Sequence, residues 1–380
     1  MESFEALLGP SRIVHGAGSL DRLGELTREL GATRVLLVTD SGLREAGHVE
    51  RACIALREAS LKTTVYDGVE IDPTTRHVAE GLALAQESRA DCIIGLGGGS
   101  AMDCAKGVNF LFTNGGRMED YQGTNRASAP MLPSLGIPTT AGTGSEGQSY
   151  ALIRRETDGA KMACGDRKAL FRTVILDPSL CASAPPAAVA ATGVDAIAHA
   201  VESHVSTRSN PVSRLFSREA WRLLDSGFPT VAARGPGGTD LDTWSEMQLG
   251  AFFAGAAIEH SMLGAAHACA NPLTARFSIQ HGSAVGIFLP HVIRFNASDV
   301  GSSYGDLCGS PENAGVAIPL EQRVRELIGM TGLPDSLRDY EVPRGLLDQM
   351  ATEAERQWTA GFNPRAVTRK ELLEIYDAAY

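Results

Sequence analysis

The chain has 380 residues and a formal net charge of −11 at pH 7. An acidic balance of this size repels phosphate backbones and anionic lipid surfaces, so we expect neither nucleic acid nor a membrane as a partner. Because 380 residues exceed what one ordinary hydrophobic core accommodates, two domains are the default expectation. A composition of 43% hydrophobic and 21% charged residues is typical of a folded globular protein and excludes a fibrous or disordered chain.

Cysteine usage indicates a reducing compartment. The seven cysteines are scattered singly without a Cys-x-x-Cys pair, and several lie in apolar runs, where a reduced thiol behaves as a small hydrophobe. The segment from Met1 to Pro10 is neither basic nor apolar enough for a signal peptide, and no stretch approaches the ~20 apolar residues of a membrane span. We therefore expect a cytoplasmic protein.

The first half of the chain alternates strand and helix patterns. Short runs rich in β-branched and apolar residues predict strands at residues 34–39, 61–66, 92–96 and 172–176. Helical spacing predicts helices at 75–88 and from Ser100 to about Leu111. Strands alternating with helices are typical of βαβ units around a parallel sheet.

The pattern changes after Pro185-Pro186. From Ala187 onward the sequence is alanine-rich and helical, and amphipathic helices are predicted at residues 211–224, 241–257 and 320–331. We expect an α/β domain over residues 1–184 and an all-helical domain over 185–380.

A glycine run ends the third predicted strand and opens a helix. Gly97-Gly98-Gly99-Ser100 lets the backbone approach an anion closely, and the free N–H groups at the start of the helix attract it, so a dinucleotide pyrophosphate fits there. The alternative is a tight strand-to-helix turn without a ligand, because the run is not the Gly-x-Gly-x-x-Gly fingerprint.

A second loop, residues 138–146, is dense in hydroxyls and glycines and can line a phosphate or ribose site; the alternative is a polar surface loop. Asp40 follows the first predicted strand. A carboxylate there accepts hydrogen bonds from a ribose 2′-hydroxyl and repels a 2′-phosphate, which favours NAD over NADP, although an Asp that merely begins a turn is the simpler interpretation.

Four side chains form a candidate metal site. Asp195 and His199 are spaced i, i+4, which places both on one face of a helix. His267 and His281 come from a second helix and the loop after it, amid small apolar residues where an imidazole needs a partner. One carboxylate and three imidazoles suit Fe²⁺, Zn²⁺ or Mn²⁺. Each histidine taken alone is more simply structural, and the hypothesis depends on the combination.

In the order and spacing of these motifs, the chain resembles the iron-containing (group III) alcohol dehydrogenase family along nearly its whole length. The likeness is carried by residues 97–103, 138–146, 193–202, 267–282 and 289–292.

The resemblance implies an N-terminal Rossmann-like dinucleotide-binding domain and a C-terminal helical metal-binding domain, the dehydroquinate synthase-like architecture. It implies that Asp195, His199, His267 and His281 bind a divalent metal, with Fe²⁺ favoured over Zn²⁺ or Mn²⁺, and that the cofactor is NAD(H) rather than NADP(H). We expect the cofactor contacts to be Asp40, Asp72, Gly97, Gly98, Gly99, Ser100, Asp103, Thr139, Thr140, Thr143, Ser145 and Lys161. A homodimer or larger homo-oligomer is also expected.

The sequence departs from the family pattern around the expected substrate pocket. Asn271 stands where many members carry a second histidine, and Arg276 stands where an aromatic or apolar residue is frequent. We expect both near the substrate. A proton-relay role for the missing histidine does not transfer to this chain, and Arg276 raises the alternative of an anionic substrate.

These observations predict reversible hydride transfer between a nicotinamide and a small alcohol or aldehyde, with the metal acting as a Lewis acid. A maleylacetate reductase-like oxidoreductase is an alternative. A lyase like dehydroquinate synthase would need a basic cluster that the metal-site segments lack, and a non-catalytic metal- and nucleotide-binding protein would not need four ligands.

Overall fold

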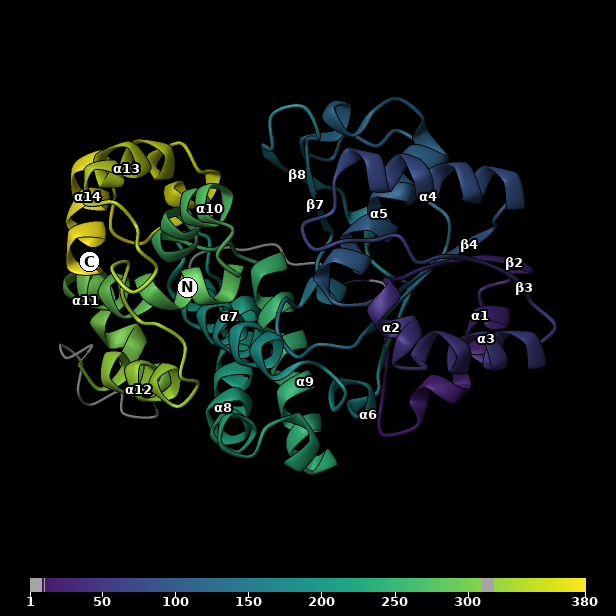
Figure 1. The fold of residues 1–380 in the computed structure, drawn as a ribbon, viewed down its shortest axis with the longest axis horizontal. Coiled ribbons are helices and arrows are strands. Elements are labelled where there is room, and N and C mark those ends of the chain that lie inside the picture. The colour runs from purple at the N-terminus through teal and green to yellow at the C-terminus, as the bar shows by residue number, and fades with distance from the viewer. Residues whose placement is uncertain (1–8, 10, 309–317) are drawn as a thin grey trace. The chain divides into compact units, whose positions relative to one another are not determined.

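The computed structural model describes residue 9, residues 11–308 and residues 318–380. The described chain divides into two compact units, whose helices and strands are labelled in Figure 1. The α/β unit runs to Thr140 and resumes at Ser145–Ala184, and the helical unit comprises Ala141–Gly144 and Pro185–Tyr380. The predicted fold class, a parallel α/β part followed by an all-helical part, is confirmed.

A six-stranded, all-parallel sheet forms the centre of the α/β unit, in the order β1-β9-β6-β4-β2-β3. Its strands are β1 (Arg12–His15), β2 (Arg34–Val38), β3 (Lys62–Tyr66), β4 (Cys92–Gly97), β6 (Ser134–Pro138) and β9 (Thr173–Leu176). The strands predicted at residues 34–39, 61–66, 92–96 and 172–176 are confirmed. β1 and β6 were not predicted.

Alternate residues of β2 belong to two separate cores. Leu36 and Val38 pack with α4 (Thr75–Ser88) and α5 (Gly99–Asn114), whereas Val35 and Leu37 pack with α1 (Leu23–Glu29) and α3 (His48–Glu58). Figure 1 shows these two pairs of helices on opposite faces of the sheet. Because successive strand side chains point to opposite faces, helices on both faces explain why β2 is an unbroken apolar run rather than an alternating one.

The remaining elements of the α/β unit connect and flank the sheet. Its helices are α1 (Leu23–Glu29), α2 (Ser41–Glu45), α3 (His48–Glu58), α4 (Thr75–Ser88), α5 (Gly99–Asn114) and α6 (Pro178–Cys181). A smaller sheet of β5 (Gly123–Thr124), β8 (Lys161–Gly165) and β7 (Tyr150–Arg154) was not predicted. The helices predicted at 75–88 and 100–111 are confirmed as α4 and α5.

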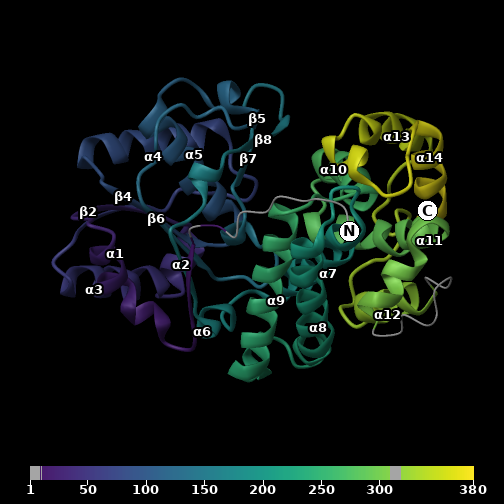
Figure 2. The same cartoon turned by 180° about the vertical axis from the view of Figure 1, so that it is seen from behind.

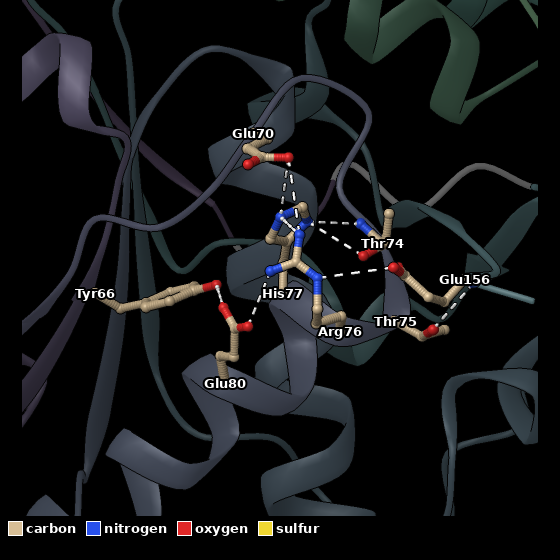
Figure 3. Close-up of polar contacts among 8 residues, drawn as sticks. All are labelled: Tyr66, Glu70, Thr74, Thr75, Arg76, His77, Glu80 and Glu156. Carbon is tan, nitrogen blue, oxygen red and sulfur yellow. Dashed lines mark hydrogen bonds and ion pairs between the residues drawn. The ribbon is translucent and has the colours of Figure 1, made fainter.

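A polar cluster ties the start of α4 to the segment after β7 (Figure 3). The Arg76 guanidinium lies 3.0 Å from a Glu80 carboxylate oxygen and 3.7 Å from one of Glu156. The buried His77 ring accepts a hydrogen bond from the Thr74 N–H through Nδ1. Each exposed ion pair contributes roughly 0–1 kcal/mol, so the cluster acts mainly by fixing geometry: it anchors the turn that carries Asp72.

The helical unit consists of α7 (Pro186–Val205), α8 (Pro211–Arg234), α9 (Leu241–Glu259), α10 (Ala265–Phe277), α11 (His281–Leu307), α12 (Ile318–Gly329), α13 (Leu347–Glu355) and α14 (Arg369–Ala378) (Figure 2). α7 packs against α8, α9 and α11 and is buried along most of its length. Its alanines and glycine allow backbones to approach closely, which places any polar side chain on α7 in the interior.

The helices predicted at 211–224, 241–257 and 320–331 correspond to α8, α9 and α12. α8 continues past Leu224 to Arg234, with Pro229 inside it, because Phe228 and Val231 are buried and extend its apolar face. No helix in the described ranges is long and apolar enough to cross a membrane.

Candidate functional site

The first two predicted metal ligands lie one turn apart on α7. Asp195 and His199 are both buried, and the Asp195 Oδ1 lies 3.4 Å from the His199 Nε2. The i, i+4 spacing read from the sequence thus brings these two side chains together inside the helical unit.

The other two predicted ligands come from the helices that follow. His267 is in the first turn of α10 and His281 is the first residue of α11. Their Nε2 atoms lie 3.4 and 3.9 Å from Asp195 Oδ1. The His199 and His267 rings stack at 4.9 Å between centroids.

A glycine allows the start of α11 to reach α7. A Cβ atom on Gly282 would lie 1.9 Å from the Ala191 carbonyl oxygen, far inside van der Waals contact. Any larger residue would push α11 away and carry His281 with it. The packing of two helix backbones therefore positions this imidazole.

The arrangement fits a divalent cation. Asp195, His267 and His281 each offer a ligand atom within 4.8 Å of the others. His199 is not one of these three, although its Nε2 lies 3.4 Å from Asp195 Oδ1. Among the described residues, Asp195 Oδ1 and His267 Nε2 are buried and have no hydrogen-bond partner. A buried carboxylate oxygen in this state is costly, and a first-row cation with one oxygen and several nitrogen ligands satisfies it.

The electrostatics of the cluster also favour a positive charge. Burial opposes protonation of His267, but the neighbouring Asp195 and Glu202 carboxylates outweigh it and raise the pKa of His267 to about 9. Burial lowers the pKa of His199 to about 4. Despite its burial, the surrounding imidazoles hold the pKa of the Asp195 carboxyl below its ordinary value.

Sequence reasoning missed Glu202, which lies behind His267. Its Oε2 is 2.5 Å from His267 Nδ1, and its Oε1 accepts a 2.7 Å hydrogen bond from the Ala266 N–H. Glu202 is seven residues after Asp195 on α7, so two helical turns put it on the same face. That spacing could have identified it.

The predicted glycine turn lies between β4 and α5. Gly97 has a φ of 151°, and a Cβ atom there would lie 2.7 Å from the Ala101 Cβ and 3.4 Å from the Asp40 Oδ2. Gly98 caps α5 without a side-chain hydrogen bond, and Gly99 and Ser100 form the first turn of α5. Asp40 therefore lies beside the turn, and its Oδ1 also accepts a hydrogen bond from the Leu43 N–H at the start of α2.

The hydroxyl-rich segment after β6 joins the same region. The Thr139 N–H donates a 3.0 Å hydrogen bond to the Gly97 carbonyl. A Cβ atom on Gly98 would lie 3.6 Å from the Thr140 hydroxyl. Thr139 and Thr140 thus lie against the glycine turn within the α/β unit.

The glycines of that segment have a packing role. A Cβ atom on Gly142 would lie 2.2 Å from the Thr192 Cβ on α7, and one on Gly144 would lie 2.7 Å from the Ala251 carbonyl on α9. Both glycines, with Thr143 between them, belong to the helical unit. Close contact with two helices therefore explains glycines that the sequence analysis interpreted as part of a phosphate or ribose site or of a polar surface loop.

Two further predicted cofactor contacts are engaged with one another. The buried Ser145 hydroxyl donates a 2.5 Å hydrogen bond to Asp103 Oδ1, and the Lys106 ammonium, also buried, donates to the Ser145 carbonyl and hydroxyl at 2.7 and 2.9 Å. Lys106 was missed, although it is one turn after Asp103 on the same helix face. This network holds the loop against α5.

Asp72 and Lys161 form an ion pair of 3.2 Å. Asp72 has a left-handed φ of 55° in the turn before α4, and Lys161 begins β8. The structure brings these two predicted cofactor residues together within the α/β unit.

The two predicted substrate residues lie further along α10. Asn271 is one turn after His267 and donates a 3.0 Å hydrogen bond to the Gln357 side chain. Arg276 forms a two-pronged ion pair with Glu353, 2.9 Å from Nε to Oε2. Its charge is therefore neutralised by a neighbouring carboxylate.

Comparison with known proteins identifies the family. The profile described as "Iron-containing alcohol dehydrogenase" matches residues 10–178, and that described as "Fe-containing alcohol dehydrogenase family, C-terminal" matches residues 189–380. The 1,3-propanediol dehydrogenase of Citrobacter freundii is 32% identical over 382 residues, covering 98% of each chain. The lactaldehyde reductase of Escherichia coli is 32% identical over 380 residues, covering 96% of this chain and 97% of its own length.

The fold agrees with that assignment. The crystal structure of a 1,3-propanediol oxidoreductase superposes with a TM-score of 0.92 at 31% identity, covering 100% of both chains. The protein is therefore an oxidoreductase and belongs to the iron-containing alcohol dehydrogenase family, whose members use a divalent metal and NAD(H).

Proposed function

We propose that the protein interconverts small uncharged alcohols and aldehydes with NAD(H), using a divalent cation held by Asp195, His199, His267 and His281. The observation that carries the proposal is the convergence of three helices on Asp195 Oδ1, with imidazole nitrogens at 3.4, 3.4 and 3.9 Å. Fe²⁺ is the ion favoured by the family, with Zn²⁺ and Mn²⁺ as alternatives for the same ligand set.

The ligand set determines the charge that the substrate meets. One carboxylate and three neutral imidazoles would leave a divalent ion with net positive charge. When bound, the cation supplies Lewis-acid polarisation of the substrate oxygen and the nicotinamide supplies or accepts the hydride. The protein's own task is to hold the four side chains in place, which α7, α10 and α11 do through close backbone packing.

NAD(H) is favoured over NADP(H) in this proposal. Asp40 lies next to the Gly97 turn, 3.4 Å from the Cβ position there. A carboxylate at this place accepts ribose hydroxyls and repels a 2′-phosphate. The glycine turn, with the α5 N-terminus behind it, is suited to the pyrophosphate.

An uncharged substrate is favoured over an anionic one. Glu353 already pairs with Arg276 in a two-pronged geometry, so releasing the guanidinium for a substrate anion would break that pair. The relatives named for 1,3-propanediol and lactaldehyde act on small uncharged molecules that carry a second oxygen function. The Asn271 amide, one turn from His267, could hydrogen-bond such a group.

The test is turnover with defined metals. Apo-protein is reconstituted with Fe²⁺, Zn²⁺ or Mn²⁺, and NADH oxidation is followed at 340 nm with propanal, 3-hydroxypropanal, lactaldehyde, the anionic succinic semialdehyde and maleylacetate. We expect metal-dependent turnover of the uncharged aldehydes. Full activity of the metal-free protein would overturn the mechanism, and a preference for maleylacetate would favour the reductase alternative.

Two variants complete the test. Asp195→Ala combined with His267→Ala should keep the fold by circular dichroism and lose both metal and turnover. Arg276→Ala should leave kcat/KM for uncharged aldehydes within about twofold. A selective loss of kcat/KM for succinic semialdehyde in that variant would instead support the alternative of an anionic substrate. Binding of metal and NADH without any turnover would indicate a non-catalytic protein.

A further inference from the structure

Glu202 lies outside the set of four proposed ligands yet contacts one of them directly. It is buried on α7, with 4% of its surface exposed. A buried carboxylate is retained at a cost unless its oxygens are hydrogen-bonded, so its two partners define what it does.

Both Glu202 oxygens are committed to the first turn of α10. Oε1 accepts the Ala266 N–H at 2.7 Å, and Oε2 lies 2.5 Å from His267 Nδ1. The N-cap residue of α10, Gly264, has no side chain to cap the helix. A Cβ atom at that position would lie 3.0 Å from Glu202 Oε1. The carboxylate occupies the space that the glycine leaves and caps the helix from outside.

The hydrogen bond to Nδ1 has a consequence for the other ring nitrogen. A carboxylate can only accept, so His267 carries its hydrogen on Nδ1 when it bonds to Glu202. Nε2 then presents a lone pair, and this is the atom that faces Asp195 Oδ1 at 3.4 Å. The same contact fixes the rotation of the ring about its Cβ–Cγ bond.

We propose that Glu202 is a positioning residue that sets the tautomer and orientation of His267 for metal binding, while capping α10. The proposal rests on the proposed function, because it assumes that His267 binds the cation through Nε2. Outer carboxylates that orient metal-binding histidines typically change metal affinity by about 10–100-fold when removed.

Two substitutions separate tautomer control from capping. Glu202→Met has no acceptor and removes both hydrogen bonds at nearly constant volume. Asn363→Ala removes the neighbouring cap on α10, the bond from the Ala265 N–H to Asn363 Oδ1 of 3.2 Å, and leaves His267 untouched. A purely structural Glu202 would make the two variants behave alike.

The measurement is Co²⁺ affinity, by competition with a chelator, together with the visible spectrum of the bound ion. We expect Glu202→Met to weaken Co²⁺ binding about 10–100-fold and to alter the spectrum, with Asn363→Ala within about threefold of the unaltered protein despite a lower Tm. A folded Glu202→Met protein that binds Co²⁺ within about twofold of the unaltered protein, with the same spectrum, would overturn the proposal.

A second readout needs neither metal nor turnover. In ¹⁵N-histidine-labelled apo-protein, the His267 resonances should report a protonated Nδ1 at high pH, and Glu202→Gln should shift the ring toward the Nε2–H form because its amide can donate to Nδ1. An unchanged tautomer in Glu202→Gln would contradict the proposal even if Glu202→Met fails to fold. Aldehyde reduction by the unaltered protein is scored separately: its absence removes the proposed function and leaves the tautomer result standing.

Discussion

The metal cluster and the glycine turn are built by opposite means. At the metal cluster, side chains from three helices meet. Two of their atoms, Asp195 Oδ1 and His267 Nε2, are buried without a hydrogen-bond partner among the described residues. The glycine turn is built from backbone contacts: the Thr139 N–H bonds to the Gly97 carbonyl, and a Cβ atom on Gly97 would lie 2.7 Å from the Ala101 Cβ. In the proposed function, the first site would select its ion by charge and ligand geometry, and the second would select the dinucleotide by shape and backbone donors.

This contrast predicts how each region fails. A change at the cluster should abolish chemistry with little effect on the dinucleotide, whereas a change at the turn should weaken dinucleotide binding and leave metal loading intact. Substitutions at glycines separate the two regions most clearly, because Gly282, Gly97 and Gly98 each lie against an identified neighbour.

The largest effect is expected for Gly282→Val. The Cβ atom of the valine would lie 1.9 Å from the Ala191 carbonyl oxygen, which is a clash. α11 must therefore move, and His281 moves out of the cluster with it. Overpacking of this kind costs about 1–3 kcal/mol or more. We expect at least about 100-fold weaker Zn²⁺ binding, measured by chelator competition.

The matched control is Gly329→Ala at the end of α12, where a Cβ atom would meet nothing within 4 Å. It should leave metal affinity unchanged. Wild-type Zn²⁺ affinity in folded Gly282→Val would mean that backbone contact does not position His281.

The next effect is expected at the glycine turn. Gly98→Ala adds a Cβ atom at ordinary contact distance, 3.6 Å from Thr140, with an allowed backbone. The fold should tolerate it, but the methyl group would occupy the space in front of the α5 N-terminus. We expect NADH to bind about 10-fold more weakly, about 1.4 kcal/mol, by fluorescence titration, with Tm and metal content unchanged.

Gly97→Ala is the companion variant. Its φ of 151° and the 2.7 Å approach to Ala101 should lower Tm as well as NADH affinity. If both variants lower Tm equally, the turn is structural and the ligand interpretation of Gly98 is wrong.

A comparable effect is expected for Asp40→Asn. The amide oxygen can still accept from the Leu43 N–H that Asp40 caps, so α2 should remain intact while the negative charge is lost. The ratio of kcat/KM for NADPH to that for NADH should rise about 10-fold. An unchanged ratio would show that Asp40 does not face the adenosine ribose.

The sequence predicted the parts of each region that are local, and missed those that depend on distant contacts. The Asp195–His199 spacing and the Gly97 turn are readable because both lie within one helix or one strand-to-helix junction. β1 was missed because it pairs with β9, which is far away in the sequence, and β6 is held between β4 and β9. β6 also contains Gly136 and Pro138, which weaken its strand pattern.

Side chains whose role depends on burial were the hardest to predict. Glu202 and Lys106 look like ordinary surface charges in the sequence, and only the packing of α7 and α5 reveals that they are enclosed. The glycines at 142 and 144 were assigned to a ligand site or to a surface loop, because the local sequence does not show that they pack against α7 and α9. Long-range packing, rather than propensity, decides these assignments.

The smallest effect on turnover is expected at Glu146, which is buried within the α/β unit. Burial raises the pKa of Glu146 from 4.5 to about 7. Between these values the folded state keeps a proton that the unfolded state has released, so the free energy of unfolding should fall as pH rises from about 4.5 to 7 and level off above 7.

The variant Glu146→Gln removes this pH dependence. Its free energy of unfolding at pH 8 should exceed that of the unaltered protein by about 1–3 kcal/mol. Thermal unfolding of both proteins at pH 5, 6, 7 and 8 measures the difference, with the exposed Glu58→Gln as a charge-matched control. A constant difference in Tm across this range would mean that Glu146 is ionised in the folded protein, with Lys106 compensating its charge.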